Sequence, residues 1–401
     1  MPPKLSLKDL LVKGKKVLMR VDFNVPLDKN GKITDDTRIR ASLPSIQYIL
    51  ERGGSIILMS HLGRPKNKKT PDFSLAPCAQ QLSQLLGKPV IMAKDCVGEE
   101  VRELVKDLQP GQILLLENLR FHEGEENPDK DPQFAKELAS LGDLYVNDAF
   151  GTAHREHAST AVIAKYFPDK AAAGLLIEKE LDFLGKALLD PKRPFYALIG
   201  GAKVSSKIGI LKSLLEKADA LLIGGGMAYT FFKAQGIPIG QSIHEDDFLN
   251  EAREILAAAK TINVKIILPI DQVIADKVDA DASKRIIDSA TGIPDGMQGV
   301  DIGPKTIELF TNELKQASTL LWNGPLGVFE IPAFATGTQA IAKVIAGLKA
   351  TTIVGGGDSI AALQAAGLAD KVSHVSTGGG ATLEFIEYGT LPGIEALSNR
   401  N

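Results

Sequence analysis

Short runs of apolar residues alternate with longer amphipathic stretches along the whole chain. The short runs are rich in Val, Ile and Leu, and most are apolar at successive positions. Runs of this kind are typical of strands buried on both faces of a parallel sheet. The predicted strands are Val17–Arg20, Ser55–Ser60, Ile113–Glu117, Leu144–Asn147, Phe195–Ile199, Ala220–Ile223, Lys265–Leu268, Thr319–Trp322, Thr352–Val354 and His374–Val375.

Between these runs, apolar residues recur at three- and four-residue spacing, as on a helix with one buried face. The predicted helices include Thr37–Arg52, Glu99–Leu108, Ser205–Lys217 and Thr336–Leu348. About ten strand–helix units are too many for one compact open sheet. The pattern therefore predicts an α/β fold with two doubly wound, Rossmann-like parallel-sheet domains.

The border between the two domains is expected at Leu175–Asp190, a long amphipathic stretch typical of a helix. The tetrapeptide Pro191–Pro194 follows, and a proline at each of its ends stops that helix. We therefore expect an N-terminal domain over 1–174, a hinge helix over 175–190 and a C-terminal domain over 191–387. The segment Val278–Gly303 is rich in Asp and Gly and weakly patterned, which favours surface loops and short edge strands.

Composition narrows the classes of partner. The 401 residues include 46 Lys and Arg against 49 Asp and Glu, so no overall charge points to nucleic acid or to a membrane surface. Two cysteines, Cys78 and Cys96, do not have a metal-ligand spacing, and so few cysteines favour a reducing compartment. The N-terminus has no apolar signal-peptide core, and no apolar run approaches the ~18 residues of a membrane span. We expect a cytoplasmic protein.

Polar and basic residues follow the predicted strands of the first half, where open parallel sheets bind ligands. Guanidinium groups bind phosphate and carboxylate through paired hydrogen bonds, so a convergent set suits a small polyanion. This rim comprises Arg20, Arg38, Arg64, Arg120, Arg155, His61 and His154, with Asp22 and Asn24 after the first strand. Alternatives stay open: Asp22 and Asn24 also suit a turn before Pro26, and Arg20 and His154 also suit structural roles.

The second half places glycines where predicted strands pass into helices. These are Gly200–Gly201, Gly224–Gly226, Gly355–Gly357 and Gly378–Gly380. Together they favour a bed for nucleotide phosphates, because glycine allows close approach of the backbone and a helix N-terminus favours anions. Lys203 and Lys207, four apart on one expected helical face, would reach phosphate oxygens.

Two acidic residues of the second half have two readings each. Asp358 suits either a simple helix N-cap or a ligand for the Mg²⁺ that accompanies a nucleotide. Glu330 suits either a solvated loop or a contact with ribose.

Several familiar motifs are absent from the sequence. There is no GxxxxGK[ST] phosphate loop and no GxGxxG fingerprint, since Tyr229, Ile360 and Leu383 stand where a third glycine would be. Asp148–Gly151 reads DAFG and lacks the HRD loop of protein kinases. The His154–His157 spacing does not make the HExxH motif of a zinc protease.

The chain resembles the phosphoglycerate kinase family over essentially its whole length. The motifs that carry the resemblance are KVLMRVDFNVP at Lys16–Pro26, SHLGRP at Ser60–Pro65, LLLENLRFH at Leu114–His122, NDAFGTAHR at Asn147–Arg155, GGAKVSSK at Gly200–Lys207, WNGPLGVFE at Trp322–Glu330, GGGDS at Gly355–Ser359 and STGGGA at Ser376–Ala381. The resemblance implies reversible transfer of the acyl phosphate of 1,3-bisphosphoglycerate to ADP, giving 3-phosphoglycerate and ATP, with Mg²⁺ as cofactor. It also implies that the two domains face each other across a cleft, are joined by a hinge helix and close during the reaction.

The family's functional positions match residues in both halves. The resemblance assigns 3-phosphoglycerate or 1,3-bisphosphoglycerate to Asp22, Asn24, Arg38, His61, Arg64, Arg120 and Arg155. It assigns the nucleotide to Gly201, Ala202, Lys203, Lys207, Gly225, Gly299, Asn323, Pro325, Glu330, Gly356, Gly357, Asp358 and Ser359. Arg38, Lys203 and Lys207 would be catalytic, Asp358 would hold Mg²⁺, and the tail 388–401 would return to the N-terminal domain.

Two other functions are compatible with parts of the pattern. A two-lobed NAD-dependent dehydrogenase would also use glycine turns, although the missing GxGxxG argues against it. A two-lobed anion-binding protein would use the arginine rim without turnover, although the second glycine set argues against it. No long unexplained apolar face is evident, so we expect a monomer whose partners are small molecules.

Overall fold

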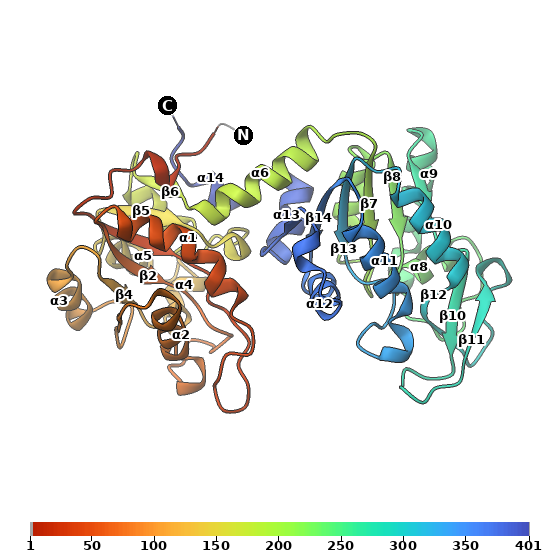
Figure 1. Ribbon diagram of the computed structural model, residues 1–401, viewed down its shortest axis with the longest axis horizontal. Helices are drawn as coiled ribbons and strands as arrows, with labels where there is room; N and C mark the ends of the chain where they lie inside the picture. Colours follow the sequence, from red (N-terminus) through yellow and green to blue (C-terminus); the bar gives the residue numbers. More distant parts are fainter. Residues whose placement is uncertain (1–2, 401) are drawn as a thin grey trace. The chain divides into compact units, whose positions relative to one another are not determined.

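The computed structural model describes residues 3–400, except for the side chains of 187–189 (Figure 1). Residues 1, 2 and 401, which belong to the predicted N-terminal domain and tail, lie outside the described residues. The chain divides into two compact units. Unit 1 comprises Met1–Asp182 with Thr390–Asn401, and unit 2 comprises Phe183–Gly389.

Unit 1 is built on a six-stranded parallel sheet in the order β3-β4-β2-β1-β5-β6. Its strands are β1 Lys16–Arg20, β2 Ser55–Met59, β3 Val90–Met92, β4 Ile113–Leu115, β5 Leu144–Asn147 and β6 Ala171–Ala173. Its helices are α1 Thr37–Glu51, α2 Ala76–Leu86, α3 Glu99–Asp107, α4 Glu123–Glu126, α5 Pro132–Ala139 and α14 Pro392–Glu395. The chain visits the sheet out of sequence order, as a doubly wound fold does.

The core of unit 1 follows from the apolar strands. Alternate residues such as Val17 and Met19 pack in one cluster with Ile39 and Ile46 of α1. Leu18, which points to the opposite face, is also fully buried. Burial on both faces explains why these strands are apolar at successive positions.

The C-terminal segment packs on unit 1. The N–H of Gly393 in α14 donates to the carbonyl of Ala153 (2.7 Å), and the side-chain amide of Asn147 donates to the Gly393 carbonyl (3.2 Å). The N–H of Ser398 donates to the carbonyl of Ala171 in β6 (2.9 Å). Strands β5 and β6 and the loop after β5 are therefore held in part by hydrogen bonds to residues 393–398.

Unit 2 is built on a second six-stranded parallel sheet, in the order β15-β14-β13-β7-β8-β9. Its strands are β7 Phe195–Ile199, β8 Ala220–Ile223, β9 Lys265–Ile267, β13 Thr319–Asn323, β14 Thr351–Gly355 and β15 His374–Val375. Its helices are α7 Ile208–Leu215, α8 Met227–Ala234, α9 Leu249–Thr261, α10 Pro304–Leu314, α11 Thr336–Ala346, α12 Gly357–Ala365 and α13 Gly380–Tyr388. The α/β class with two parallel sheets is confirmed.

Unit 2 has a second sheet, which was not expected from the sequence. It is antiparallel, in the order β11-β10-β12, with β10 Asp271–Ala275, β11 Lys284–Asp288 and β12 Gln298–Ile302. The prediction of loops and short edge strands over Val278–Gly303 was therefore only partly right. The strand β11 is largely exposed, so its sequence lacks the apolar run that marks the parallel strands.

Helix α6 (Leu175–Leu189) spans the border between the two units, close to the predicted Leu175–Asp190. Its N-terminus is fixed within unit 1. The carboxylate of Asp148 accepts a hydrogen bond from the N–H of Leu176 (2.8 Å), and the Ser45 hydroxyl accepts one from the N–H of Leu175 (2.8 Å). These bonds satisfy N–H groups that a helix start leaves without partners.

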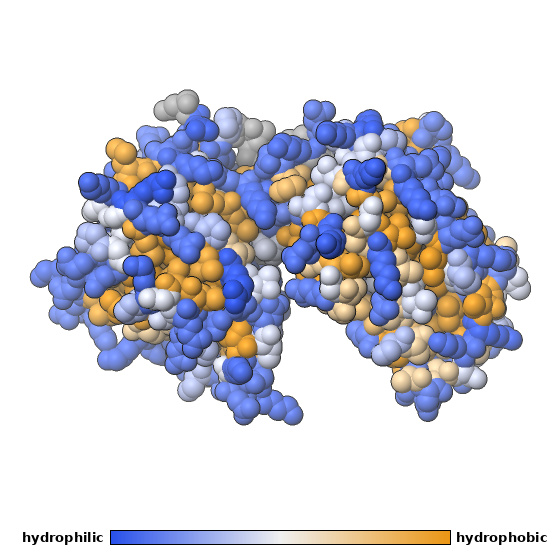
Figure 2. All heavy atoms as spheres, in the orientation of Figure 1, coloured by the Kyte–Doolittle hydropathy of each residue, from blue (hydrophilic) through white to orange (hydrophobic). Residues whose placement is uncertain are grey.

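The visible face of each unit carries hydrophilic residues interspersed with smaller apolar areas (Figure 2). Large exposed apolar side chains, such as Leu11, Ile286 and Tyr388, are far apart in the sequence. Among the helices of the described residues, none combines the length and the apolar character that crossing a bilayer requires.

Candidate active site

The first candidate site lies at the carboxyl edge of the unit 1 sheet. Asp22 and Asn24 follow β1, and His61 follows β2. Arg120 lies in a short 3₁₀ helix after β4, and Arg155 lies in the loop after β5, beyond the 3₁₀ helix Phe150–Thr152. Because these strands are parallel, the polar segments after them meet at one edge of the sheet.

Arg38 reaches this edge from the first turn of α1. Its guanidinium forms an ion pair of 2.8 Å with the carboxylate of Asp22. The Arg38 side chain keeps 37% of its surface exposed, whereas that of Asp22 keeps only 9%. Asp22 therefore orients a guanidinium whose remaining donors face solvent, where an anion would bind.

The backbone of Gly63 joins two more of the predicted residues. Its N–H donates to the side-chain oxygen of Asn24 (2.9 Å), and its carbonyl accepts from the guanidinium of Arg120 (2.9 Å). Gly63 has φ +61°, and a Cβ atom there would lie 2.4 Å from the Phe73 ring. Glycine is therefore required at this point of the loop.

Arg20 is not part of an exposed rim, which corrects the grouping made from the sequence. Its side chain is 1% exposed and lies 3.9 Å from the carboxylate of Glu125. The guanidinium donates to the Ser159 hydroxyl (2.8 Å) and contacts Nδ1 of His61 (3.2 Å). This buried network fixes the position of the His61 ring.

Positive charge accumulates around His61. Burial lowers the pKa of His61 well below its usual value, and the charges of Arg20, Arg120 and Arg38 lower it further. Its ring is therefore neutral at physiological pH, which makes it a hydrogen-bonding group and not a cation.

A neighbouring arginine also affects His154, in the loop after β5. Burial and the charge of Arg155 lower the pKa of His154 to about 4. Arg155 is half-buried, whereas Arg64 is exposed and has no ion-pair partner within the described part of the chain. The structure thus brings Arg38, Arg120 and Arg155 to one region, with Arg64 at its solvent side.

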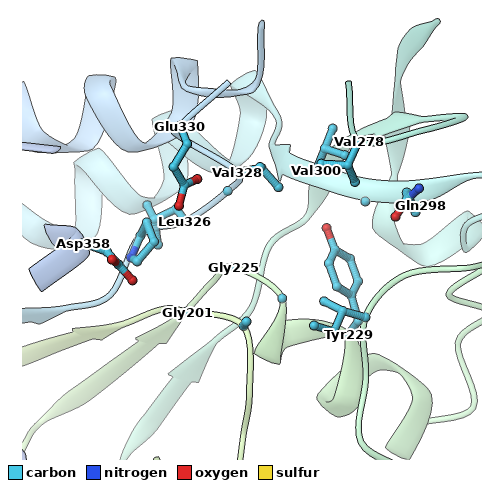
Figure 3. Close-up of a pocket in the computed structure, with 16 residues that line it drawn as sticks. Gly201, Gly225, Tyr229, Val278, Gln298, Val300, Leu326, Val328, Glu330 and Asp358 are labelled. Carbon is cyan, nitrogen blue, oxygen red and sulfur yellow. The ribbon is translucent and has the colours of Figure 1, made fainter. Parts of the chain in front are cut away.

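The second candidate site is a cavity of about 380 Å³ in unit 2 (Figure 3). Seven of the predicted nucleotide residues line it: Gly201, Ala202, Gly225, Gly299, Pro325, Glu330 and Asp358. The other six, Lys203, Lys207, Asn323, Gly356, Gly357 and Ser359, are not among its lining residues. In Figure 3 the carboxylates of Asp358 and Glu330 lie at one end of the cavity, and Tyr229 and Gln298 lie at the other.

Two glycines let neighbouring loops approach closely beside this cavity. Gly225 has φ +69°, and a Cβ atom there would lie 2.7 Å from the carbonyl oxygen of Pro325. A Cβ atom at Gly200 would lie 2.2 Å from the same oxygen. The glycines therefore pack the turns after β7, β8 and β13 against one another and expose backbone to the cavity.

The two lysines do not share a helical face, which corrects the prediction from their spacing. Helix α7 begins only at Ile208, so Lys203 and Lys207 lie in the turn before it. Lys203 is exposed, whereas Lys207 is half-buried and donates a hydrogen bond to the side-chain oxygen of Asn323. Burial lowers the pKa of Lys207 to about 8, against the opposing effect of Asp358.

Asp358 lies in the first turn of α12, with its side chain exposed. It forms no side-chain cap of this helix, which removes the simple capping role left open by the sequence. Ser359 is buried, and its hydroxyl accepts a hydrogen bond from the N–H of Gly324 (2.5 Å). Ser359 therefore fixes the loop after β13, and Asp358 is free to act on a ligand.

Comparison with known proteins gives the family. The sequence model described as "Phosphoglycerate kinase" matches residues 7–388. The chain belongs to the phosphoglycerate kinase family. It is similar to the phosphoglycerate kinase of Koribacter versatilis (strain Ellin345), with 56% identity over 99% of this chain and 100% of that one. It is also similar to the cytosolic phosphoglycerate kinase of Triticum aestivum, with 57% identity over 96% of each chain.

Solved structures of phosphoglycerate kinases have the same fold. The enzyme from Coxiella burnetii matches with a TM-score of 0.88 and 43% identity, over 98% of each chain. The enzyme from Pyrococcus horikoshii OT3 matches with a TM-score of 0.84 and 34% identity, also over 98% of each chain. Membership of this family makes the chain a phosphotransferase.

In this member of the phosphoglycerate kinase family, the sequence motifs did not indicate the apolar wall of the cavity in unit 2. Its residues are Tyr229, Ile243, Val278, Val300, Leu326 and Val328. They come from α8, from loops and from β12. Leu326 and Val328 stand within the motif Trp322–Glu330, but nothing in the local sequence indicates that they meet the other four. The ring of Tyr229 is buried, and a Cβ atom at Gly299 would lie 1.9 Å from its hydroxyl. That close contact gives a structural reason for glycine at this position.

Proposed function

We propose that this chain catalyses reversible transfer of the acyl phosphate of 1,3-bisphosphoglycerate to ADP, which gives 3-phosphoglycerate and ATP. The observation that carries the proposal is the pairing of two different sites within one chain of the phosphoglycerate kinase family. Unit 1 has a cluster of guanidinium groups at a sheet edge, and unit 2 has a glycine-lined cavity beside a helix start.

The cluster in unit 1 has the chemistry of a site for a small anion. Arg38, Arg120 and Arg155 carry fixed positive charge, and neutral His61 adds a hydrogen-bonding group. Such a set matches the phosphate and carboxylate groups of 3-phosphoglycerate. Asp22 and Asn24 support this cluster. Asp22 forms an ion pair with Arg38, and the side-chain oxygen of Asn24 accepts a hydrogen bond from the N–H of Gly63.

The cavity in unit 2 has the two halves that a nucleotide needs. Its apolar wall, with Val300 and Val328, suits the faces of a purine ring. At the other end lies the start of α12, which begins at Gly357. The N–H groups and the helix dipole at such a start favour phosphate. Glu330 lines the cavity and suits a ribose hydroxyl.

The residues beside this helix start also fit the Mg²⁺ of a magnesium–nucleotide complex. Mg²⁺ is commonly held by one or two carboxylates together with substrate phosphates. The exposed Asp358 offers one carboxylate at the edge of the cavity. When bound, the ion would neutralise phosphate charge, and the remaining contributions come from the protein.

Catalysis by these residues is electrostatic. The attacking carboxylate of 3-phosphoglycerate is already ionised at pH 7, so the reverse reaction needs no general base. The barrier then falls through alignment of the two substrates and neutralisation of charge on the transferring group. We assign that neutralisation to Arg38 and Lys203, while Lys207 holds nucleotide phosphates. Backbone N–H groups at Gly357–Ser359 and Gly379–Gly380 assist.

The substrates bind different units, so transfer requires the units to bring them together. We assign the hinge to α6, whose first turn is fixed in unit 1 by Asp148 and Ser45. The same proposal includes action as a cytoplasmic monomer on small molecules alone, without nucleic acid or membrane. Both cysteines are free and buried, as suits a reducing compartment.

The test is a coupled assay with 3-phosphoglycerate and MgATP, in which glyceraldehyde-3-phosphate dehydrogenase oxidises NADH. Turnover that needs both substrates and Mg²⁺ is expected. A folded protein that binds 3-phosphoglycerate without turnover would instead be a non-catalytic anion-binding protein. Tight binding of NAD in a titration would favour the dehydrogenase alternative.

A further inference from the structure

Three potential metal ligands meet in unit 1 outside the residues used above. Asp95, Cys96 and His122 each contribute one donor atom, and these atoms all lie within 4.8 Å of one another. They supply a carboxylate, a thiol and an imidazole. Within the described residues, these three form the group of at least three His, Cys, Asp or Glu side chains whose donor atoms lie close enough together to hold one metal ion.

Neighbouring strands position the group. Asp95 and Cys96 follow β3, and the loop is tied to β4 because the N–H of Ala93 donates to the carbonyl of Leu115 (2.9 Å). His122 precedes α4, and its ring stacks on that of Phe134, with centroids 4.9 Å apart and an interplanar angle of 19°. The donors therefore come from packed segments and not from a free loop.

The present contacts are ones that a metal would replace. Nε2 of His122 lies 2.5 Å from a carboxylate oxygen of Asp95, and the Cys96 thiol donates to the Glu117 carbonyl at 2.9 Å. Metal–ligand bonds of about 2.0–2.3 Å place the donors of a tetrahedron about 3.3–3.8 Å apart. Movements of about 1 Å in these side chains would therefore form the site, with release of protons.

Asp95 supplies the one carboxylate of the group, and its charge favours a cation. The Lys69 ammonium lies 3.7 Å from Asp95 and opposes such an ion, but it is largely exposed, so water and salt screen its charge.

We propose that Asp95, Cys96 and His122 form a binding site for Zn²⁺, with water as the fourth ligand. A sulfur and a nitrogen donor beside a single carboxylate suit zinc and do not suit Mg²⁺ or Ca²⁺, which prefer oxygen ligands. The side chains of Asp95 and His122 are 40% and 28% exposed, so the ion enters from their side. Cys96, which is fully buried, forms the inner end of the site.

Cobalt provides a direct test, because Co²⁺ bound to a thiolate gives a charge-transfer band in the near ultraviolet. The full chain, freed of metal with a chelator and kept reduced, is titrated with Co²⁺ and then with Zn²⁺. We expect one equivalent of Co²⁺ to produce the band and Zn²⁺ to remove it by displacement. The Cys96→Ser variant should lose the band. Cys78→Ser is the matched control, since Cys78 is also buried but lies outside the cluster, and it should keep the band.

The half-exposed ligands provide variants that leave the core intact. His122→Gln and Asp95→Asn should each weaken Co²⁺ binding by at least about tenfold, with unchanged circular dichroism. Zn²⁺ should raise the melting temperature of the unaltered chain and not that of His122→Gln. The proposal is wrong if the unaltered chain shows no thiolate band, if Cys96→Ser keeps it, or if His122→Gln binds Co²⁺ as tightly.

Discussion

The ammonium group of Lys207 donates a hydrogen bond to the side-chain oxygen of Asn323 and so links the turn before α7 to the end of β13. Asn323 is buried, and its amide nitrogen has no hydrogen-bond partner among the described residues. Burial lowers the pKa of Lys207 to about 8, so its charge is poorly solvated. A partly desolvated ammonium beside an unpaired amide donor is well suited to receive phosphate oxygens.

We therefore expect Lys207→Met to weaken the binding of MgATP. A hydrogen bond to a charged group contributes about 1.5–3 kcal/mol, which corresponds to roughly a 10–100-fold rise in Kd. Isothermal titration calorimetry measures this directly. Lys212→Met is the matched control, because Lys212 is exposed on α7. Equal MgATP affinity in Lys207→Met and the unaltered chain would remove Lys207 from the site.

Arg38 should affect turnover far more than nucleotide affinity. Loss of one preorganised donor to the transition state costs about 10²–10³ in kcat. We expect Arg38→Ala to lower kcat to that extent in the coupled assay, while the Kd for ADP stays within twofold. Arg40→Ala provides the control, since Arg40 lies on the same helix and pairs with Asp36 at 2.8 Å. A kcat loss explained wholly by weaker ADP binding would contradict the catalytic assignment.

The sequence predicted the parallel sheets well, because those strands are buried on both faces and read as apolar runs. Leu144–Asn147, Phe195–Ile199 and Ala220–Ile223 have the predicted bounds. The short edge strand β3 (Val90–Met92) was missed, since three residues give too little pattern. The antiparallel strands β10 to β12 were missed as a sheet because one of them is mostly exposed.

The candidate sites were predictable only where local sequence carries the chemistry. Arginines after strands and glycines before helices stand out in the sequence. Arg38 and Arg120 lie at the site in unit 1, and Gly201 and Gly225 line the cavity in unit 2. The placement of Lys207 depends on where α7 begins, which spacing alone did not reveal. The cavity wall formed by Tyr229 and Val300 depends on tertiary packing between distant segments. No local pattern encodes such a contact.

Arg20 should matter for folding. It is paired with Glu125 in a buried network, and removal of one partner leaves an uncompensated charge. We expect Arg20→Met to lower the free energy of unfolding of unit 1 by about 3–5 kcal/mol, measured by urea denaturation. Arg102→Ala breaks the exposed pair with Glu99 (2.7 Å) and should cost at most about 1 kcal/mol. Similar losses in both variants would show that the Arg20 network is not stabilising.

Asp148 should make the stability of unit 1 depend on pH. One carboxylate oxygen accepts the N–H of Leu176, whereas the other is buried without a partner among the described residues. Burial raises the pKa of Asp148 from 3.8 to about 7, against the hydrogen bonds that it accepts. Between these two values the folded protein holds a proton that the unfolded chain has lost. The free energy of unfolding therefore falls as pH rises from about 4 to 7, by at most about 4 kcal/mol.

Asp148→Asn removes this titration and keeps an oxygen that can accept the N–H of Leu176. We expect the variant to be more stable than the unaltered chain at pH 8 and closer to it at pH 5, as measured by urea denaturation at both values. Asp107→Asn changes an exposed carboxylate and should leave the difference between the two pH values unaltered. If Asp148→Asn is destabilised equally at pH 5 and pH 8, the carboxylate is ionised throughout. In that case its charge supports the start of α6 through the helix dipole.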